Sequence, residues 1–305
     1  MIKKISIIGA GAVGSTLAFN LLSRLKLQEL ALVDIYPGLA CGIAFDLEDT
    51  RGILNFSTNI TGSENYSNIK GSDIVVLTAG VARKQGMSRA DLFKTNSKVA
   101  IEASRQIKKL APSSIVIVVT NPLDAITHIV SRQTKFDRKR VIGMGALLDT
   151  SRLLNIIYKS CKILPSSVDA FVYGLHNKDM IVSTARMNIK GQKLDNFMSK
   201  QLIGQVPQKV QLRGAEIVKN LKTRSASFAP ALACSALIEA IAFDKSEIIP
   251  VSVLLNGEYG LKDVCIGVPC IINAKGADSI IEMALSAGEK KAIAKANKFL
   301  QECMI

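Results

Sequence analysis

The sequence predicts an α/β protein whose first half forms a doubly wound parallel sheet and whose second half forms an α+β domain. In the first half, short apolar runs alternate with longer amphipathic stretches, which is typical of βαβ units. Residues 115–119 are apolar at every position, which indicates a strand covered by helices on both faces. A turn at 190–192 between apolar segments favours antiparallel strands in the second half. We expect domains at 1–145 and 146–305, packed tightly because no low-complexity linker separates them.

The individual elements follow from the same apolar patterns. In the first half we expect strands at 5–8, 30–35, 74–79, 115–119 and 141–145, with helices that include 12–25 and 91–110. In the second half we expect helices at 149–159, 209–221, 231–242 and 287–302, and strands at 168–173, 180–189, 249–254 and 264–268. The helix at 231–242 is expected to begin after Pro230, because proline cannot continue a helix.

A glycine-rich segment joins the first expected strand to the first expected helix. It reads Gly9-Ala10-Gly11-Ala12-Val13-Gly14-Ser15. Gly9 allows a tight turn, Gly11 leaves room for a pyrophosphate, and Gly14 lets the helix pack against the strand. The N-terminus of the helix presents free N–H groups to the phosphates. This spacing also occurs in ordinary strand-to-helix turns, but the flanking strand and helix favour a Rossmann dinucleotide-binding domain.

An acidic residue ends the second expected strand, about 20 residues after the glycine-rich segment. This residue, Asp34, can accept hydrogen bonds from the ribose of an adenosine. Its negative charge repels a 2′-phosphate, and the following Ile35-Tyr36-Pro37 offers no cation to bind one. The sequence therefore favours NAD over NADP as the cofactor.

The composition is typical of a globular protein, with 48% hydrophobic and 21% charged residues. No apolar run approaches the roughly 20 residues of a membrane helix. The first apolar stretch leads into Gly9, so we expect a strand there and not a secretory signal. The 6 cysteines form no Cys-x-x-Cys pair and only 2 histidines accompany them, so we expect reduced thiols, no metal site and a cytoplasmic protein.

The net charge of +14 is large, and its densest cluster lies at 132–140. Such a cluster could bind an acidic polymer, but the remaining lysines are dispersed along the chain. A solvated loop is the better interpretation, and we expect no nucleic-acid partner. The charge can still steer anionic substrates toward the protein at low salt.

The scarcity of histidine narrows the search for a catalytic base. His128 lies in an apolar helical segment, where we expect a packed residue. His176 follows an expected strand, and catalytic groups collect at such element ends. Asp149 and Arg152 stand three positions apart and share one face of a helix. Taken alone, they favour a surface ion pair of little energetic weight.

Two further segments follow expected strands, at the edge where parallel sheets bind ligands. The first, 80–89, holds Arg83, Lys84 and Arg89. It is either a solvated loop or a lid that closes over an anion and excludes water. In the second, Thr120-Asn121-Pro122, the amide of Asn121 can hydrogen-bond a ligand, although Asn-Pro is also common in loops.

Together these segments resemble the lactate/malate dehydrogenase family, most closely its malate dehydrogenase members, over essentially the whole chain. The resemblance is carried by 9–15, 34, 83–89, 120–124, 143–152, 174–176, 225–230, 257–260 and 266–269. It implies NAD-dependent, reversible oxidation of (S)-malate to oxaloacetate. It also implies a homodimer or homotetramer with a dicarboxylate substrate and no membrane partner.

The resemblance implies a role for each candidate residue. His176 is expected to give and take the proton, and Asp149 to orient its imidazole. Arg152 is expected to grip the α-carboxylate of the substrate, and Arg89 to polarise the reacting carbonyl. Asn121 is expected to contact both substrate and cofactor. The full set of expected cofactor contacts is Gly9, Ala10, Gly11, Ala12, Val13, Gly14, Ser15, Asp34, Asn96, Val119, Thr120 and Asn121.

Arg83 occupies the position that separates malate from lactate enzymes, where similar lactate dehydrogenases carry glutamine. Oxaloacetate has a second carboxylate, which a guanidinium matches in a bidentate fork. Pyruvate has only a methyl group there, so closing the lid would bury Arg83 without a partner. A dehydrogenase for lactate or another 2-hydroxy acid is the alternative activity.

The chain departs from the pattern of the family after its histidine. The family usually has Gly-Asp-Ser/Thr, whereas this chain has Asn177-Lys178-Asp179. Asn177 could take the left-handed conformation of the missing glycine, and Lys178, if close, could lower the pKa of His176. Arg224 also stands where glycine is common. These departures leave a non-catalytic NAD-binding protein as a further alternative, although they remove none of the expected catalytic groups.

Overall fold

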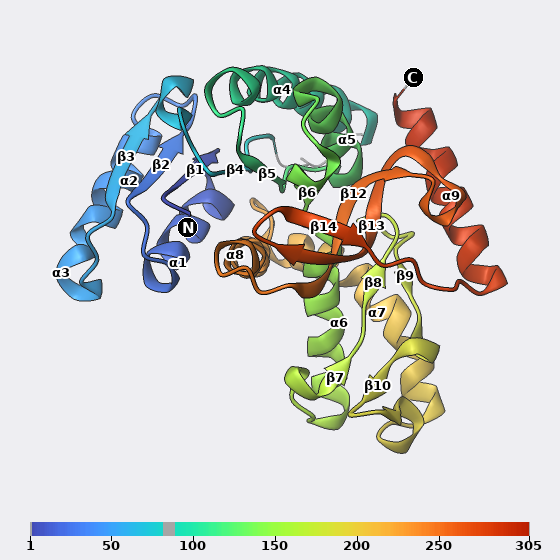
Figure 1. The fold of residues 1–305 in the computed structure, drawn as a ribbon. Coiled ribbons are helices and arrows are strands. Elements are labelled where there is room, and N and C mark those ends of the chain that lie inside the picture. The colour runs from blue at the N-terminus through green and yellow to red at the C-terminus, as the bar shows by residue number, and fades with distance from the viewer. Residues whose placement is uncertain (1, 82–88, 305) are drawn as a thin grey trace.

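The computed structural model describes residues 2–81 and 89–304, and among these residues its main feature is a nine-stranded sheet (Figure 1). In order across the sheet, the strands are β14 (Gly276–Ile280), β13 (Lys262–Asn273), β12 (Glu247–Asn256), β6 (Val141–Gly143), β5 (Ile115–Val118), β4 (Ile74–Leu77), β1 (Lys4–Ile8), β2 (Glu29–Val33) and β3 (Asn59–Ser63). From β6 to β3 the neighbouring strands are parallel. The strand order reverses between β1 and β4, which confirms the expected doubly wound sheet.

Helices cover both faces of the parallel strands because successive side chains point to opposite faces. Val76 of β4 belongs to the apolar core that includes Leu21 of α1 (Ala12–Arg24). The next residue, Leu77, belongs to a second core with Ile107 of α4 (Arg89–Leu110). Figure 1 shows α4 and α5 (Leu123–Thr134) together on one side of the sheet and α1 on the other. These two cores explain why the strands are apolar at nearly every position.

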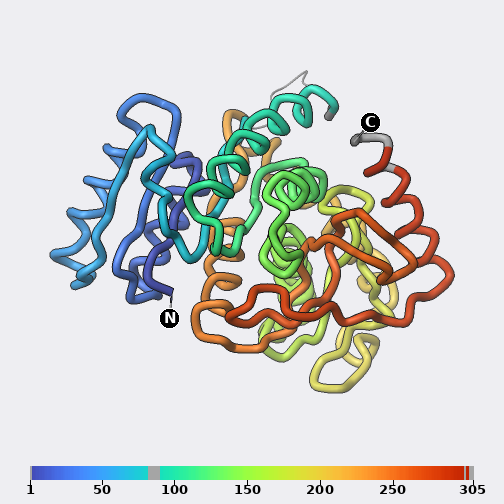
Figure 2. The backbone as a smooth tube through the Cα atoms, turned by 45° about the horizontal axis from the view of Figure 1, so that its top comes forward, coloured from blue at the N-terminus to red at the C-terminus, as the bar shows by residue number. Residues whose placement is uncertain are grey.

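The second half of the chain extends the main sheet and builds a third core. β12 pairs antiparallel with β6 at Ser252 and Gly143, so one sheet crosses the expected domain boundary. The third core lies between α6 (Gly145–Cys161) and α7 (Lys200–Leu221). The short strands nearby are β7 (Val168–Asp169), β8 (Val172–Tyr173), β9 (Ile181–Val182), β10 (Asn188–Ile189) and β11 (Gln192–Lys193). The N-terminal strands and the last helix, α9 (Ala287–Met304), lie at opposite ends of the molecule in both views (Figure 1, Figure 2).

The structure differs from the sequence expectations mainly in short or polar elements. The expected strands at 168–173 and 180–189 are each divided, the first into β7 and β8 and the second into β9 and β10. The strands β3 and β14 and the helices α2 (Leu39–Asp49) and α3 (Arg51–Leu54) were not predicted. β3 has the sequence NITGS, whose strand state depends on its pairing with β2 more than on its own propensity.

Several helices begin earlier than the sequence predicts, and in two of them the added turns contain a proline. α7 starts at Lys200, nine residues before the expected start, and continues through Pro207. Proline removes one helical hydrogen bond, but Val206 and Val210 on either side are buried in the third core and hold the helix. α8 (Phe228–Ala242) contains Pro230 in its first turn. The expectation that this helix starts after the proline is wrong, because N–H groups of a first turn have no intrahelical acceptor to lose.

Carboxylates from the second half of the chain neutralise the basic segment 132–140. The ion pairs are Arg132–Asp263, Arg138–Glu258 and Lys139–Asp278. Arg140 instead donates to the backbone carbonyls of Pro112 and Ser114. The expectation of a solvated loop is wrong here, because this segment is fastened to the strands that extend the sheet.

The described residues offer neither a membrane-spanning helix nor a metal site. Within 2–81 and 89–304, no helix combines the length and apolar composition needed to cross a membrane. The same ranges hold no group of three or more His, Cys, Asp or Glu that could bind a metal ion. Burial raises the pKa of the Cys234 and Cys265 thiols, so both stay protonated and unreactive.

Candidate functional site

The glycine-rich segment forms the turn between β1 and α1. Gly9 has a φ of +106°, and a Cβ built there would lie 2.5 Å from the backbone nitrogen of Ala79, so the turn requires glycine. A Cβ on Gly14 would lie 1.9 Å from the carbonyl oxygen of Gly9, which explains the close contact of helix and strand. Nothing lies within 4 Å of the Cβ position of Gly11, and no side chain caps the helix. An anion can therefore reach the free N–H groups of the first turn, at Ala12, Val13 and Gly14. The N–H of Ser15 donates to the carbonyl oxygen of Gly11 at 2.9 Å and begins the helical hydrogen bonds.

Asp34 follows β2 and faces this turn. Its Oδ2 accepts the N–H of Ala10 at 2.7 Å, and its Oδ1 accepts the N–H of Tyr36 at 3.0 Å. These bonds fix the carboxylate, and each oxygen keeps a lone pair for a ligand hydroxyl. The arrangement can hold a ribose next to the glycine-rich turn.

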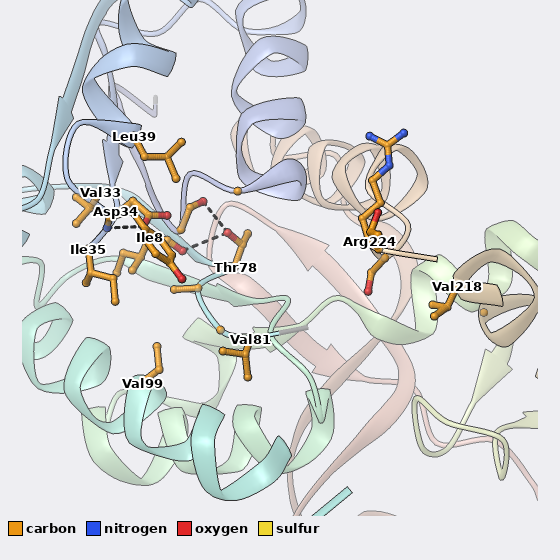
Figure 3. Close-up of a pocket in the computed structure, with 18 of the residues that line it drawn as sticks. Ile8, Val33, Asp34, Ile35, Leu39, Thr78, Val81, Val99, Val218 and Arg224 are labelled. Carbon is orange, nitrogen blue, oxygen red and sulfur yellow. Dashed lines mark hydrogen bonds between the residues drawn. The ribbon is translucent and has the colours of Figure 1, made fainter. Parts of the chain in front are cut away.

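A cavity of about 1620 Å³ opens between the carboxyl ends of the parallel strands and the end of α7 (Figure 3). Asp34 and Thr78 lie on the strand side, and Val218 and Arg224 lie on the opposite wall (Figure 3). Doubly wound sheets bind their ligands in the crevice at this edge, where the strand order reverses. The cavity is therefore the best candidate for a dinucleotide site.

Buried polar side chains tie together the ends of β4 and β5. Asn96 Oδ1 accepts the N–H of Val81 at 2.9 Å, and its Nδ2 donates to the carbonyl oxygen of Asn121 at 2.7 Å. The Oγ1 of Thr120 donates to the carbonyl oxygen of Ala79 at 2.7 Å. The residues that follow β5 directly are Val119, Thr120 and Asn121. Asn96 thus positions the backbone at this edge, and its own contact with a cofactor stays a prediction.

Asp149 joins His176 to Arg152. Asp149 Oδ1 accepts a hydrogen bond from Arg152 Nη1 at 3.0 Å, and its Oδ2 lies 2.6 Å from His176 Nδ1. The side chain of Asp149 is 1% exposed, and those of Arg152 and His176 are 13% exposed. The interpretation as a surface ion pair is therefore wrong, because the segment carrying His176 and helix α7 pack over this face of α6.

Opposing effects act on the pKa of His176. Burial disfavours the charged imidazolium, but the carboxylates of Asp149 and Asp124 favour it more strongly, so the pKa is raised above its usual value. The positive charge of Arg152 acts to lower the pKa of His176, because it disfavours the imidazolium. Lys178 is exposed, and the groups that shift the pKa of His176 most are Asp149, Asp124 and Arg152.

The residues after His176, where the chain departs from the family pattern, form a turn in which Asn177 is not left-handed. Asn177 is not among the described residues with positive φ, contrary to the expectation. Its side-chain oxygen accepts the N–H of Asp179 at 2.6 Å, and its own N–H donates to the carbonyl oxygen of Leu175 at 2.8 Å. This local turn, closed by the asparagine side chain, replaces the glycine conformation.

Arg152 retains hydrogen-bonding capacity beside the cavity. Its Nε is buried and has no partner among the described residues. Gly214 lines the cavity, and a Cβ built on it would lie 3.5 Å from Arg152 Nη1. The guanidinium therefore lies next to the cavity wall with a donor free for an acidic ligand. The described lining of the cavity does not include His176.

The 80–89 segment holds the two other arginines that are expected to contact the substrate. Arg83 lies outside the described residues. Arg89 begins helix α4, and the role of its side chain stays a prediction from the sequence.

Sequence analysis missed two residues that contact His176. Gly145 begins α6, and a Cβ there would lie 2.6 Å from Cγ of His176, so the imidazole packs where a side chain would otherwise be. Asp124 accepts the backbone N–H of His176 at 2.7 Å. Both residues lie in segments that carry the resemblance, but nothing in their local sequence points to a partner so far along the chain.

Two family models match the chain nearly end to end. Residues 3–143 match the lactate/malate dehydrogenase NAD binding domain, and residues 146–304 match the alpha/beta C-terminal domain of the same family. The chain belongs to the lactate/malate dehydrogenase family. The resemblance seen in the sequence is confirmed, and the N-terminal half is the NAD-binding domain of this family.

Relatives and solved structures within the family include both activities. The chain is 40% identical over 301 residues to a malate dehydrogenase of Trichormus variabilis, covering 99% of this chain and 93% of that protein. A malate dehydrogenase structure from Cryptosporidium parvum matches with a TM-score of 0.95 at 34% identity, covering 99% of this chain and 98% of that one. A lactate dehydrogenase of that organism, crystallised with lactic acid and NAD, matches with a TM-score of 0.94 at 28% identity, covering 99% and 97%.

Proposed function

We propose that this chain is an NAD-dependent malate dehydrogenase that interconverts (S)-malate and oxaloacetate, with His176 giving and taking the proton. The observation that carries the proposal is the buried cluster of Asp149, His176 and Arg152 beside a cavity that begins at a glycine-rich turn. Oxidation of a 2-hydroxy acid needs a base, a cation for the carboxylate and a dinucleotide within one site. The malate dehydrogenases among its relatives support the same function.

The residues around the glycine-rich turn fit NAD. The open space at Gly11 and the uncapped N-terminus of α1 suit a pyrophosphate. The fixed carboxylate of Asp34 suits a ribose diol and repels the 2′-phosphate of NADP. NAD, when bound, supplies the acceptor and donor of hydride. The chain holds the nucleotide and orients it toward the substrate.

His176 is suited to move the proton. Asp149 engages Nδ1, which leaves Nε2 for the reacting oxygen of the substrate. Reduction of oxaloacetate needs the imidazolium form, whereas oxidation of malate needs the neutral ring. The raised pKa of His176 favours the imidazolium and hence proton donation at neutral pH.

The substrate carboxylates are assigned to arginines. Arg152 has a free buried donor for the α-carboxylate. We assign the carbonyl oxygen to Arg89 and the second carboxylate to Arg83, both from the sequence. Asn121 at the end of β5 is assigned to a contact shared by substrate and nicotinamide. Of these three guanidinium groups, that of Arg89 would stabilise the charge that develops on the reacting oxygen.

The decisive experiment measures NADH oxidation with oxaloacetate, pyruvate and 2-oxoglutarate side by side. We expect the largest kcat/KM for oxaloacetate. His176→Asn should abolish turnover while NADH still binds in a fluorescence titration. NADH binding by the wild type without turnover of any 2-oxo acid would support the non-catalytic alternative.

A dehydrogenase for lactate or another 2-hydroxy acid is the second candidate, favoured by the structural likeness to a lactate dehydrogenase. Arg83→Gln distinguishes the two. We expect it to lose about 2–5 kcal/mol of transition-state binding for oxaloacetate, because the second carboxylate loses its charged partner. The kcat/KM ratio of oxaloacetate to pyruvate measures the loss, with Lys84→Gln as the neighbouring-cation control. A wild type that prefers pyruvate, or an unchanged ratio in Arg83→Gln, would contradict the role of Arg83.

We also propose that the chain assembles with copies of itself. Large apolar side chains are exposed on three helices, with Phe45 at 66%, Ile53 at 86% and Phe228 at 72%. Large exposed apolar side chains of this kind are typical of an interface. Light scattering should give the mass of a dimer or tetramer, and a monomer at micromolar concentration would contradict the proposal.

A further inference from the structure

We propose that Asp124 is a positioning residue that holds the His176 segment from helix α5 and supports the imidazole with its negative charge. The inference rests on the proposed role of His176. It assigns to a buried carboxylate of the NAD-binding half the task of fixing a catalytic group that belongs to the other half.

The geometry is a bridge between three elements. Asp124 lies in the first turn of α5 and is 5% exposed. Its Oδ2 accepts the backbone N–H of His176 at 2.7 Å. Its Oδ1 accepts the hydroxyl of Ser252 on β12 at 2.8 Å. Ser252 is fully buried and pairs with Gly143 at the end of β6, so the carboxylate is held by the main sheet.

The bridge crosses between the two family-matched parts of the chain. Asp124 stands three residues after Asn121, which the proposed function places against nicotinamide and substrate. The hydrogen bond from the backbone N–H of His176 to Asp124 therefore fixes the position of the imidazole relative to the carboxyl ends of the strands, where the proposed function places the cofactor. Sub-ångström placement of a reacting group is worth large factors in rate.

A buried carboxylate is not needed for packing alone. An unpaired charge in the interior is destabilising, and a neutral side chain could fill the same space. Burial raises the pKa of Asp124 to about 6, against the hydrogen bonds from His176 and Ser252 that lower it. At neutral pH the group is therefore mostly ionised, in the first turn of a helix where negative charge is favoured.

The charge acts on the imidazole together with its neighbours. The charged groups that face His176 are Asp149 and Arg152 from α6 and Asp124 from α5. Asp124 itself faces Asp149, His176, Ser252 and the buried thiol of Cys265. Two carboxylates thus oppose one guanidinium at the ring, and removal of Asp124 leaves only the carboxylate of Asp149 to oppose the guanidinium of Arg152.

The test uses the small number of histidines. The chain has 2, so the imidazole signals of the 13C-labelled protein can be assigned with a His128→Gln variant. Asp124→Asn keeps an oxygen to accept the N–H of His176 and gains an amide that can donate to Ser252, so it removes the charge and preserves the shape. We expect the titration midpoint of His176 to fall by about 1 pH unit. Oxaloacetate turnover at pH 8 should fall roughly tenfold, with the Kd for NADH unchanged.

Two other variants separate charge from structure. Ser252→Ala keeps the charge but releases one side of the carboxylate, so we expect a lower kcat with the His176 midpoint unmoved. Asp263→Asn is the matched control, because Asp263 hydrogen-bonds the other histidine, His128, at 2.9 Å. Asp263→Asn should leave the titration midpoint of His176 and the rate of oxaloacetate turnover unchanged.

An unchanged His176 midpoint together with an unchanged kcat in Asp124→Asn would overturn the proposal. The same holds if Asp263→Asn moves His176 as far as Asp124→Asn does. If the wild type turns over no 2-oxo acid, the proposed function fails on its own, while the histidine titration still reads the contact between Asp124 and His176.

Discussion

Among the charged groups around His176, Asp149 favours the imidazolium most strongly. Asp149→Asn keeps the shape of the side chain and removes the charge, so the pKa of His176 should fall by about 1–3 units. Oxaloacetate reduction at pH 8 should then fall at least tenfold. The loss should be smaller at pH 6, where more of the ring stays protonated. The kcat/KM for oxaloacetate between pH 5.5 and 9 measures this effect, and coinciding profiles of variant and wild type would contradict it.

The same raised pKa links stability to pH. A histidine whose pKa is higher in the folded state stabilises the fold fully below its unfolded pKa of about 6.5. This contribution is lost as the pH rises through the folded value. The free energy of unfolding should therefore decrease across that interval in the wild type, and this part of the decrease should be absent in His176→Gln.

Gly145 carries a second prediction for the same ring. In Gly145→Ala the new methyl group would occupy space 2.6 Å from Cγ of His176, so the imidazole must move. We expect kcat to fall by about 100-fold, which is the scale of a 1 Å misplacement, with little change in NADH affinity. Gly204→Ala in α7 is the matched control, because nothing lies within 4 Å of its Cβ position. Equal kcat values for the two variants would refute the steric explanation.

Local contacts made some site residues predictable, and distant contacts hid others. The turn at Gly9 and the packing at Gly14 depend on neighbours within one βαβ unit, so spacing alone predicts them. Asp149 and Arg152 share a helix face for the same reason. The bonds of Asp124 to His176 and Ser252 span 52 and 128 positions, and no local pattern encodes them.

Among the elements, the buried parallel strands were the most predictable. β5 is apolar at each position because helices cover both of its faces, and its boundary differs from the expected one by a single residue. β14, with the sequence GADSI, has no such signal and is a strand only because it pairs with β13. The division into 1–145 and 146–305 stays a proposal, since β12 pairs with β6 across it.

The connection between α7 and α8 brings a cation to the cavity. Arg224 is exposed there and lines the wall opposite the strand ends (Figure 3). Its guanidinium should attract the negatively charged dinucleotide, although solvent screens it. Arg224→Ala should weaken NADH binding by about 0.2–1 kcal/mol, up to roughly fivefold in Kd. Fluorescence titration at 0.05 and 0.5 M salt should show the difference disappearing at high salt.

A matched cation tests the origin of that effect. Lys193 on β11 is exposed and is absent from the described cavity lining, so Lys193→Ala should leave the Kd unchanged. An equal effect of both variants would show that net charge matters and that the position of Arg224 does not.

At the scale of the whole molecule, the last helix binds the segment that carries His176 through hydrogen bonds and an ion pair. Glu289 of α9 accepts hydrogen bonds from the Tyr173 hydroxyl at 2.5 Å and from Arg186 at 3.2 Å. Lys295 of the same helix pairs with Asp179 at 2.9 Å. Residues from the far end of the chain thus hold this segment before and after the histidine. Burial opposes the charge on Glu289, but the bonds from Arg186 and Tyr173 outweigh it and lower its pKa.

This attachment predicts an acid-dependent loss of stability. Glu289→Gln leaves Arg186 facing an uncharged amide and should destabilise the fold by about 1–3 kcal/mol at pH 7. Because the folded pKa of Glu289 is lowered, its contribution is complete above the unfolded value of about 4.3 and is lost as the pH falls through the folded value. In thermal unfolding between pH 8 and 3, the Tm of Glu289→Gln should lie below that of the wild type. This difference should stay constant at neutral pH and become smaller only at the acid end. The control Glu102→Gln, on the exposed face of α4, should have the Tm of the wild type. If the Tm difference of Glu289→Gln became smaller already near pH 7, the charge of Glu289 would not be its cause.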